Sequence, residues 1–213
     1  MDFLDKNIEE YAQSFTSPES DLMNALNRET YSNKLQPRML SGHIQGSFLA
    51  MVSKMINPRR ILEIGTYTGY SALSLATGLT DDGLLYTLEV NEEHEEIAKR
   101  YFKQAGLENK IIHKLGKAEE LIVELNEPWD LVFIDADKIN YGRYYDLIIN
   151  SLPKGAWILA DNVLWSGKVL LDDDQLDPDT LALKDFSRKI QEDERVENMI
   201  LPFRDGLMLI RKR

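Results

Sequence analysis

Two carboxylates and a lysine follow an apolar run in the middle of the chain. The run at 131–134 (LVFI) ends at Asp135, and Asp137 and Lys138 come almost directly after it. An apolar run that stops in acidic residues is typical of a buried strand whose carboxyl end lies at a site. Burying ionised carboxylates is unfavourable unless they are paired or bind a metal ion. We therefore expect a positive charge beside these residues.

A second apolar run, at 157–160 (WILA), ends in Asp161 and Asn162. The carboxyl ends of parallel strands lie at one edge of the sheet, so the two motifs are expected to meet. Asp135, Asp161 and Asn162 would offer three hard oxygen ligands and leave about three of six octahedral positions open. The sequence therefore predicts a divalent-cation site, with Mg²⁺ as the first choice and Ca²⁺ or Mn²⁺ as alternatives. Such a cation would orient and acidify a hydroxyl of a vicinal diphenol, and Lys138 could accept its proton.

A strand, a tight turn and a helix are predicted at 61–71 (ILEIGTYTGYS). Gly65 and Gly69 are four residues apart, which differs from the Gly-x-Gly-x-x-Gly spacing of dinucleotide sites. Glu63 would repel a pyrophosphate but would suit a ligand that carries an ammonium and a sulfonium group, as S-adenosylmethionine (SAM) does. Glu89 ends the next predicted strand, where an acid can accept hydrogen bonds from both ribose hydroxyls. The pattern therefore favours SAM over a nicotinamide cofactor.

The composition is that of a globular protein with a substantial core. The chain has 213 residues, of which 43% are hydrophobic and 29% charged, and its formal net charge is −11. That negative charge argues against nucleic acid or an anionic membrane as a partner. The absence of cysteine excludes disulfides and thiolate sites. The N-terminus lacks the apolar core of a signal peptide, and no apolar stretch approaches the ~20 residues of a membrane span, so we expect a cytoplasmic protein.

The order of predicted elements indicates an α/β fold. Residues 2 to about 57 are expected to be helical, with Ser17-Pro18 opening a second helix and 40–56 forming a third. The strands and helices that alternate from residue 60 onward predict a parallel sheet with helices on both faces. Predicted strands are 60–64, 85–90, 110–115, 130–135 and 156–161, with helices starting near 69, 92, 118 and 141 and a later helix at 180–193.

The two last apolar runs, 198–203 and 206–211, are too close together for a parallel crossover. They are therefore expected to form an antiparallel hairpin, so that an antiparallel strand closes a mostly parallel, seven-stranded sheet. We expect a single domain over 1–213, made of an N-terminal helical cap at 1–57 and a cofactor- and metal-binding core at 58–213.

Two motifs carry a resemblance to a known family. Asp-Ala-Asp-Lys-x-Asn-Tyr at 135–141 and Asp-Asn-x-x-Trp at 161–165 occur together with the glycine turn. The chain thereby resembles the small, cation-dependent class I O-methyltransferases of the caffeoyl-CoA and catechol O-methyltransferase family, especially its bacterial members. The resemblance runs from about Met39 to the last strand. It implies a Rossmann-like SAM methyltransferase fold, a small phenolic substrate and a homodimer.

The resemblance also implies a role for each matching position. Asp135, Asp161 and Asn162 would ligate the metal, and Lys138 would be the general base. Trp165 and Ser166 would face the substrate, but plant members carry asparagine in place of Ser166, so plant caffeoyl-CoA specificity does not transfer. The cofactor site would be formed by Ser41, Glu63, Gly65, Thr66, Ser71, Glu89, Ala118 and Asp137.

Several alternatives stay open at this point. Lys138 could form only an ion pair with a neighbouring aspartate, since such pairs are common without catalysis. Trp165 could belong to the core, and the Asp-rich segment 172–179 is expected to be a solvated loop rather than a metal site. A nicotinamide-dependent oxidoreductase or a non-catalytic nucleoside-binding protein could share the fold. The leading hypothesis is a SAM- and metal-dependent O-methyltransferase of vicinal diphenols.

Overall fold

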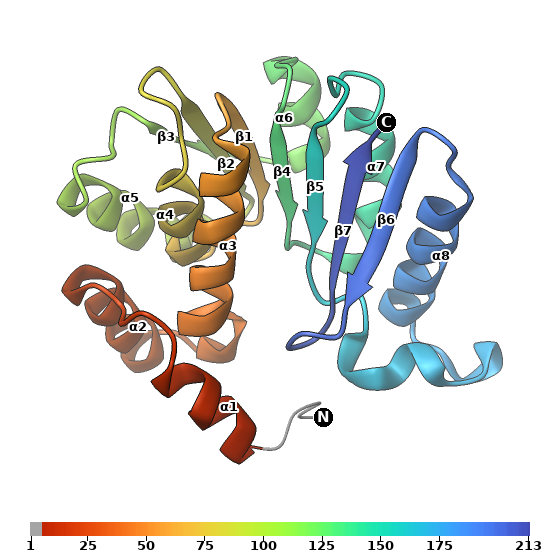
Figure 1. Ribbon diagram of the computed structural model, residues 1–213, viewed down its shortest axis with the longest axis horizontal. Helices are drawn as coiled ribbons and strands as arrows, with labels where there is room; N and C mark the ends of the chain where they lie inside the picture. Colours follow the sequence, from red (N-terminus) through yellow and green to blue (C-terminus); the bar gives the residue numbers. More distant parts are fainter. Residues whose placement is uncertain (1–5) are drawn as a thin grey trace.

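Seven strands form one mixed sheet in the computed structural model, which describes residues 6–213. Their order across the sheet is β3-β2-β1-β4-β5-β7-β6 (Figure 1). The first five strands are parallel to one another, as the alternating sequence pattern predicts. They are β1 (Arg60–Ile64), β2 (Leu84–Glu89), β3 (Ile111–Leu115), β4 (Leu131–Ile134) and β5 (Trp157–Ala160).

The predicted C-terminal hairpin is present, as β6 (Val196–Leu201) and β7 (Leu207–Lys212). The last strand of the chain does not lie at the edge of the sheet. β7 pairs antiparallel with β5 on one side and with β6 on the other, so β6 is the edge strand. The hairpin turn is thereby brought beside the segment that follows β5.

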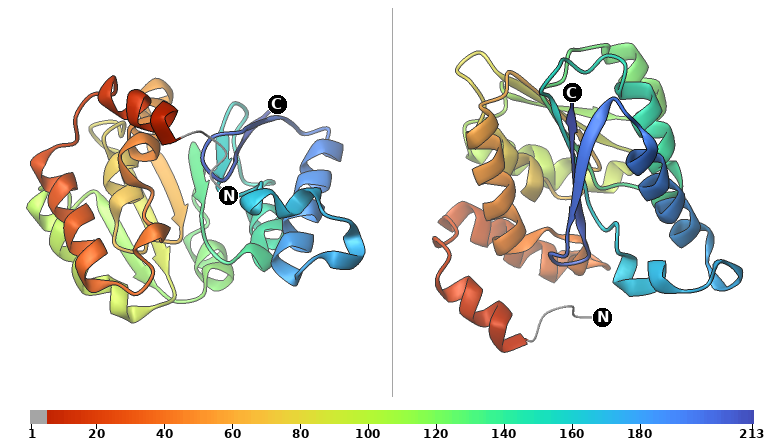
Figure 2. Two further views of the ribbon diagram at one scale, coloured as in Figure 1. Left: turned by 90° about the horizontal axis from the view of Figure 1, so that it is seen from below. Right: turned by 45° about the vertical axis from the view of Figure 1, so that its right-hand side comes forward.

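Helices cover both faces of the sheet (Figure 2). Alternate residues along a strand point to opposite faces, so Ile61 packs in one core cluster and Leu62 in the other. The face that carries Leu62 is covered by α6 (Ala118–Leu125), α7 (Tyr141–Ile148) and α8 (Pro178–Glu192). The other is covered by α2 (Asp21–Asn33), α3 (Gly42–Ile56), α4 (Tyr70–Ala76) and α5 (Glu95–Gln104), and α1 (Lys6–Ser14) precedes them.

The predicted start of the second helix was wrong. α2 begins at Asp21, where the Ser20 hydroxyl caps it by accepting a hydrogen bond from the Met23 amide at 3.3 Å. A serine at this position satisfies one of the free amides of the first turn, which Pro18 cannot do from outside the helix. The predicted helical start near residue 2 lies outside the described residues.

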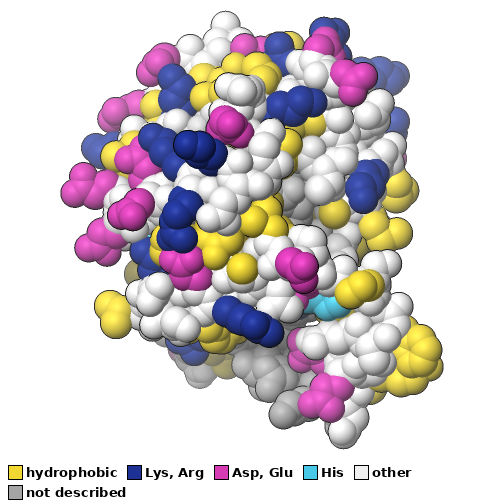
Figure 3. All heavy atoms as spheres, turned by 90° about the vertical axis from the view of Figure 1, so that its left-hand side faces the viewer, with side chains coloured by type: hydrophobic (Ala, Val, Ile, Leu, Met, Phe, Trp, Pro, Cys, Tyr) yellow, Lys and Arg dark blue, Asp and Glu magenta, His cyan; other side chains and the backbone are white. Residues whose placement is uncertain are grey.

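The described surface mixes charged and apolar side chains. Figure 3 shows acidic and basic groups interspersed with hydrophobic ones on the side that lies to the left in Figure 1. Exposed apolar residues on or next to the N-terminal helices include Tyr11, Phe15, Met51 and Met55. No helix among residues 6–213 has both the length and the hydropathy that crossing a bilayer would need.

Candidate active site

A cavity of about 1030 Å³ lies at the carboxyl ends of the central strands. It is bounded by the turn after β1, the ends of β2, β4 and β5, and the segment that leads into α3. The structure brings all but one of the predicted site residues to its lining: Ser41, Gly65, Thr66, Ser71, Glu89, Ala118, Asp135, Asp137, Lys138, Asp161, Asn162, Trp165 and Ser166. The exception is Glu63.

Asp161 lines this cavity and is only 4% exposed. Its Oδ1 accepts a hydrogen bond from the Asn162 amide at 2.8 Å, and its Oδ2 accepts one from Nε2 of Gln45 at 2.6 Å. Burial raises the pKa of Asp161 to about 6, and the negative charge of Asp135 adds to the rise. The two predicted strand-end carboxylates are therefore close enough to repel each other.

Lys138 lies beside them and is buried. Its Nζ is 3.1 Å from Oδ1 of Asp135 and donates a hydrogen bond to the Tyr141 hydroxyl at 2.8 Å. That hydroxyl in turn donates to the backbone carbonyl of Asp161 at 3.1 Å. The ion pair that the sequence left open is thus present, and Tyr141 fixes the amine between the two strand ends.

The segment after β5 has an unusual backbone. Asn162, Trp165 and Ser166 all have positive φ, at 60°, 45° and 55°. This conformation is uncommon for residues with a Cβ atom, and for a bulky residue such as tryptophan it is a true outlier. It is held by Asp205 of the hairpin turn, whose carbonyl accepts from Leu164 and whose carboxylate accepts from Ser166. Trp165 both lines the cavity and packs against the core, so the two interpretations of it are compatible.

The donor set fits a hard divalent cation. Asp135, Asp161 and Asn162 offer two carboxylates and an amide oxygen, which are ligand types that Mg²⁺ and Ca²⁺ prefer. The mutual repulsion of the two acids is a charge imbalance that a cation would relieve. No group of three or more His, Cys, Asp or Glu side chains among the described residues forms a metal site. The metal site therefore stays a prediction, which rests on two carboxylates and one amide oxygen.

The cofactor half of the cavity is built around the glycine turn. Gly65 has φ 102°, and a Cβ atom there would overlap the backbone carbonyl of Asp135, so the turn and β4 can approach only with glycine. Glu89 accepts backbone hydrogen bonds from Tyr67 at 2.8 Å and from Val90 and Asn91 at 2.9 Å each. These bonds hold its carboxylate rigidly at the cavity wall, where a ribose is expected.

Glu63 lies underneath the turn instead of in the cavity. It is fully buried, and its Oε2 accepts a hydrogen bond from the Thr87 hydroxyl at 2.5 Å. Burial raises the pKa of Glu63 to about 8, against the opposing effect of hydrogen bonds from Thr87 and Ser71. Its side chain therefore supports the turn from below, whereas direct contact with a cofactor was predicted.

Glu63 should make the free protein less stable as the pH rises. The folded pKa of about 8 exceeds the ordinary 4.5, so between these values the unfolded chain ionises while the folded carboxyl stays protonated, and stability falls. Glu63→Gln keeps an acceptor for Thr87 but removes the titration. We expect it to be more stable than the wild type above pH 8, by on the order of 5 kcal/mol, with little difference near pH 4.5. Urea unfolding at several pH values measures this, and parallel curves for the two proteins would contradict it.

Several polar side chains that bond to the predicted site residues were not themselves predicted from the sequence. Tyr141 packs in the core and also accepts a hydrogen bond from Lys138, and its position one turn after that lysine was the available signal. Tyr144 donates a hydrogen bond to Asp137. Gln45 and Arg204 come from distant segments, and no local pattern marked them.

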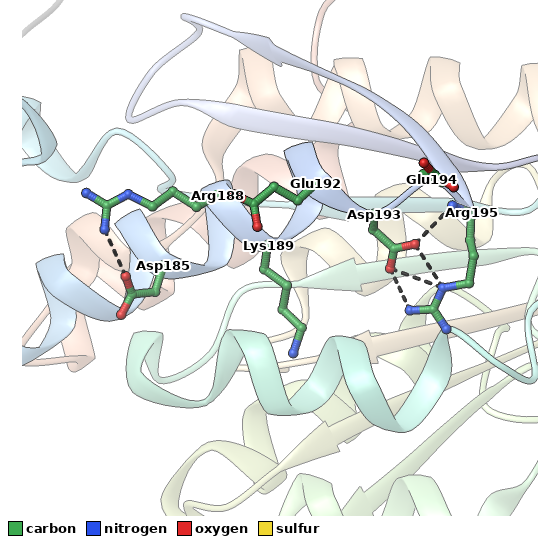
Figure 4. Close-up of a pocket in the computed structure, with 7 residues that line it drawn as sticks. All are labelled: Asp185, Arg188, Lys189, Glu192, Asp193, Glu194 and Arg195. Carbon is green, nitrogen blue, oxygen red and sulfur yellow. Dashed lines mark hydrogen bonds and ion pairs between the residues drawn. The ribbon is translucent and has the colours of Figure 1, made fainter.

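A second, shallow groove lies along the end of α8 (Figure 4). Its cations already have acidic partners: Arg195 pairs with Asp193 at 2.5 Å and Arg188 with Asp185 at 3.1 Å. A ligand would have to compete with these internal ion pairs in a solvent-exposed setting. The large cavity is therefore a better candidate for the functional site than this groove.

The Asp-rich segment 172–179 behaves as a charged surface loop. Asp173 pairs with Lys184 at 2.6 Å, and Asp177 pairs with Lys168 at 2.7 Å. Asp177 also caps α8 by accepting a hydrogen bond from the Thr180 amide. These contacts agree with the predicted solvated loop.

The strand order, the glycine turn and the strand-end acids together define a Rossmann-like methyltransferase fold. A family model described as O-methyltransferase matches residues 13–213. The chain belongs to this O-methyltransferase family, which confirms the predicted resemblance and disfavours the oxidoreductase alternative.

Known proteins of this type are similar over most of the chain. A probable caffeoyl-CoA O-methyltransferase 2 of Dictyostelium discoideum is 32% identical, over 97% of this chain and 91% of its own. Caffeoyl-CoA O-methyltransferase 2 of Petunia hybrida is 36% identical, over 79% and 74%. The O-methyltransferase of Bacillus cereus, solved in complex with SAH, superimposes with a TM-score of 0.90 at 28% identity, covering 97% of each chain. TomG of Streptomyces achromogenes, solved with SAM, gives 0.89 at 26% identity, covering 97% and 96%.

Proposed function

We propose that this O-methyltransferase transfers a methyl group from SAM to one hydroxyl of a vicinal diphenol, with a divalent cation in the site. The acceptor would be a catechol, a caffeoyl group or a related phenolic. The observation that carries the proposal is the grouping of Asp135, Asp161, Asn162 and Lys138 in one cavity with the glycine turn. The similarity to caffeoyl-CoA O-methyltransferases and to structures solved with SAM or SAH supports it.

Two groups that the chain does not itself contain would take part. SAM supplies an activated methyl group, so most of the acceleration comes from positioning the acceptor. A divalent cation held by Asp135, Asp161 and Asn162 would supply Lewis-acid chemistry, which lowers the pKa of an acceptor hydroxyl. The volume of the cavity, about 1030 Å³, leaves room for both a nucleoside cofactor and a small aromatic acceptor.

The side chains of this protein would orient the acceptor and move its proton. Trp165 offers an apolar wall, and its ring centre lies 5.7 Å from Nζ of Lys138. An aromatic acceptor against this wall would present its hydroxyls toward the strand-end acids. In its neutral form, the Lys138 amine would accept the phenolic proton, while Tyr141 holds the amine in place.

A methyl-transfer screen tests the proposal. Purified protein with SAM should methylate catechol and a caffeoyl thioester in the presence of Mg²⁺, and EDTA should stop the reaction until Mg²⁺ is restored. Resorcinol, whose hydroxyls are not adjacent, is the matched negative acceptor, because it cannot present two neighbouring oxygens. Binding of SAM without turnover of any diphenol would contradict the proposal and favour a non-catalytic role. The homodimer, the cytoplasmic location and the choice among Mg²⁺, Ca²⁺ and Mn²⁺ stay predictions.

A further inference from the structure

The turn between β6 and β7 has a strained residue at the mouth of the cavity. The turn is closed by a hydrogen bond from the Gly206 amide to the Phe203 carbonyl at 3.0 Å. Arg204 follows Phe203 with φ 50°. A positive φ at this position of a tight turn is normally taken by Gly, Asn or Asp, because a Cβ atom makes it unfavourable. Strain of this kind often marks a functional position.

The guanidinium of Arg204 reaches from the hairpin to the start of α3. It donates hydrogen bonds to the backbone carbonyls of Leu40 and Ser41 and to Oε1 of Gln45, the last at 2.5 Å. All three acceptors lie at the lining of the cavity, and Ser41 is a predicted cofactor contact. The side chain therefore ties the N-terminal segment to the C-terminal hairpin across the cavity mouth.

The hydrogen bond from Arg204 determines the orientation of the side-chain amide of Gln45. Arginine can only donate, so it selects the Oε1 side of the amide. Nε2 must then point away from Arg204, and it donates to Oδ2 of Asp161 at 2.6 Å. Gln45 is only 2% exposed, so water cannot easily replace either bond. Without Arg204 the amide could turn and present oxygen to the carboxylate, which would repel it.

The same turn holds the opposite wall of the cavity. Asp205, the next residue, accepts a hydrogen bond from the Ser166 amide at its carboxylate and one from the Leu164 amide at its backbone carbonyl. Two consecutive side chains of opposite charge thus fix the start of α3 and the segment after β5. Gln45 links the start of α3 to Asp161, which is the first residue of the segment after β5.

We propose that Arg204 is a positioning residue, which acts through Gln45 to hold Asp161 in the arrangement that binds the cation. This inference rests on the proposed metal-dependent function. Arg204 needs no contact with substrate for this role. Its strained backbone is retained because glycine at 204 would relieve the strain but lose the guanidinium.

Arg204→Gly is the discriminating variant, since it removes the side chain and the unfavourable φ together. Its Tm should fall by no more than a few degrees, because the loss of the hydrogen bonds to Leu40, Ser41 and Gln45 is partly offset by the relief of backbone strain. Its affinity for Mn²⁺, measured by electron paramagnetic resonance on the protein without acceptor, should fall by about 10-fold, as is typical when a group that orients a metal ligand is lost. Amides at the start of α3 should also exchange faster with deuterium.

Asn126→Gly is the matched control. Asn126 also has a positive φ, at 42°, but it ends α6 and does not line the cavity. The substitution relieves the same kind of strain, so it should leave both Mn²⁺ affinity and exchange at α3 unchanged. Arg204→Lys should recover little of the lost affinity, because a single ammonium cannot bridge the three acceptors.

A double-mutant cycle with Gln45→Leu tests the route through Gln45. We expect Gln45→Leu to weaken Mn²⁺ binding about 10-fold, and Arg204→Gly to have almost no further effect in that background. An additive loss in the double variant, or a loss seen only in the KM for the acceptor, would overturn the proposal and indicate that Arg204 contacts substrate. Unchanged Mn²⁺ affinity in Arg204→Gly would overturn it as well. Wild-type protein that binds no Mn²⁺ at all would instead overturn the metal-dependent function, and this inference with it.

Discussion

Asp161→Ala is expected to abolish cation-dependent methyl transfer, with a loss of about 10³-fold in kcat/KM, the scale of removing a group that stabilises developing charge. The substitution leaves only Asp135 and Asn162 as charged or polar oxygen donors of the predicted set. Affinity for SAM, measured by calorimetry, should change little, because Glu89 and the glycine turn lie in the other half of the cavity. Turnover should be measured over a range of Mg²⁺ concentrations.

The matched control for this variant is Asp174→Ala. Asp174 lies exposed in the Asp-rich loop, so its removal changes the net charge equally without touching the cavity. It should have wild-type turnover and Mg²⁺ dependence. Wild-type activity in Asp161→Ala, or a loss of Mg²⁺ dependence in Asp174→Ala, would show that the cation site was assigned to the wrong carboxylates.

Lys138→Met is the other variant with a large expected effect. Methionine fills a similar volume but cannot accept a proton, so kcat should fall by about 10²- to 10⁴-fold if the amine is the general base. Affinity for SAM should stay near the wild-type value. Single-turnover kinetics with saturating Mg²⁺ separate the chemical step from binding.

Lys184→Met controls for the loss of an ion pair. Lys184 is half-buried and pairs at 2.6 Å with the exposed Asp173, and neither residue belongs to the cavity lining. An ion pair with a solvent-exposed partner contributes about 1 kcal/mol or less. It should retain full kcat. A Lys138→Met enzyme with unchanged kcat but weaker Mg²⁺ binding would make Lys138 an ion-pair partner of Asp135 and leave the base to another group.

The strand-end residues could be predicted because their signal is local. The apolar runs before Asp135 and Asp161 are buried strands, and parallel strands bring their carboxyl ends to the same edge. The same reasoning located the glycine turn and Glu89. It could not place the side chain of Glu63, since a position near a strand end does not tell which face of the sheet a side chain takes.

Gln45 and Arg204 escaped prediction for a different reason. Gln45 precedes Asp161 by 116 residues in the sequence, and Gln45 and Arg204 are 159 residues apart. A lone glutamine in a helix and an arginine in a hairpin turn have no pattern that links them. Their partnership depends on β7 entering the sheet beside β5. The sequence predicted the hairpin and an antiparallel strand that closes the sheet, but not which strand of the hairpin pairs with β5.

The interior position of β7 has a consequence for how the protein is made. During synthesis the chain emerges with α3 first, the two strand-end acids next, and the hairpin only much later. Until β7 has paired with β5, the segment after Asp161 lacks its contacts to Asp205 and Gly206. In a nascent chain that is stalled before the hairpin, Trp165 should therefore not be fixed in its place beside the cavity, and the hydrogen bond from Arg204 to Gln45 should be missing. The ability to bind the cation would then appear in one step near the end of synthesis, after the hairpin has left the ribosome.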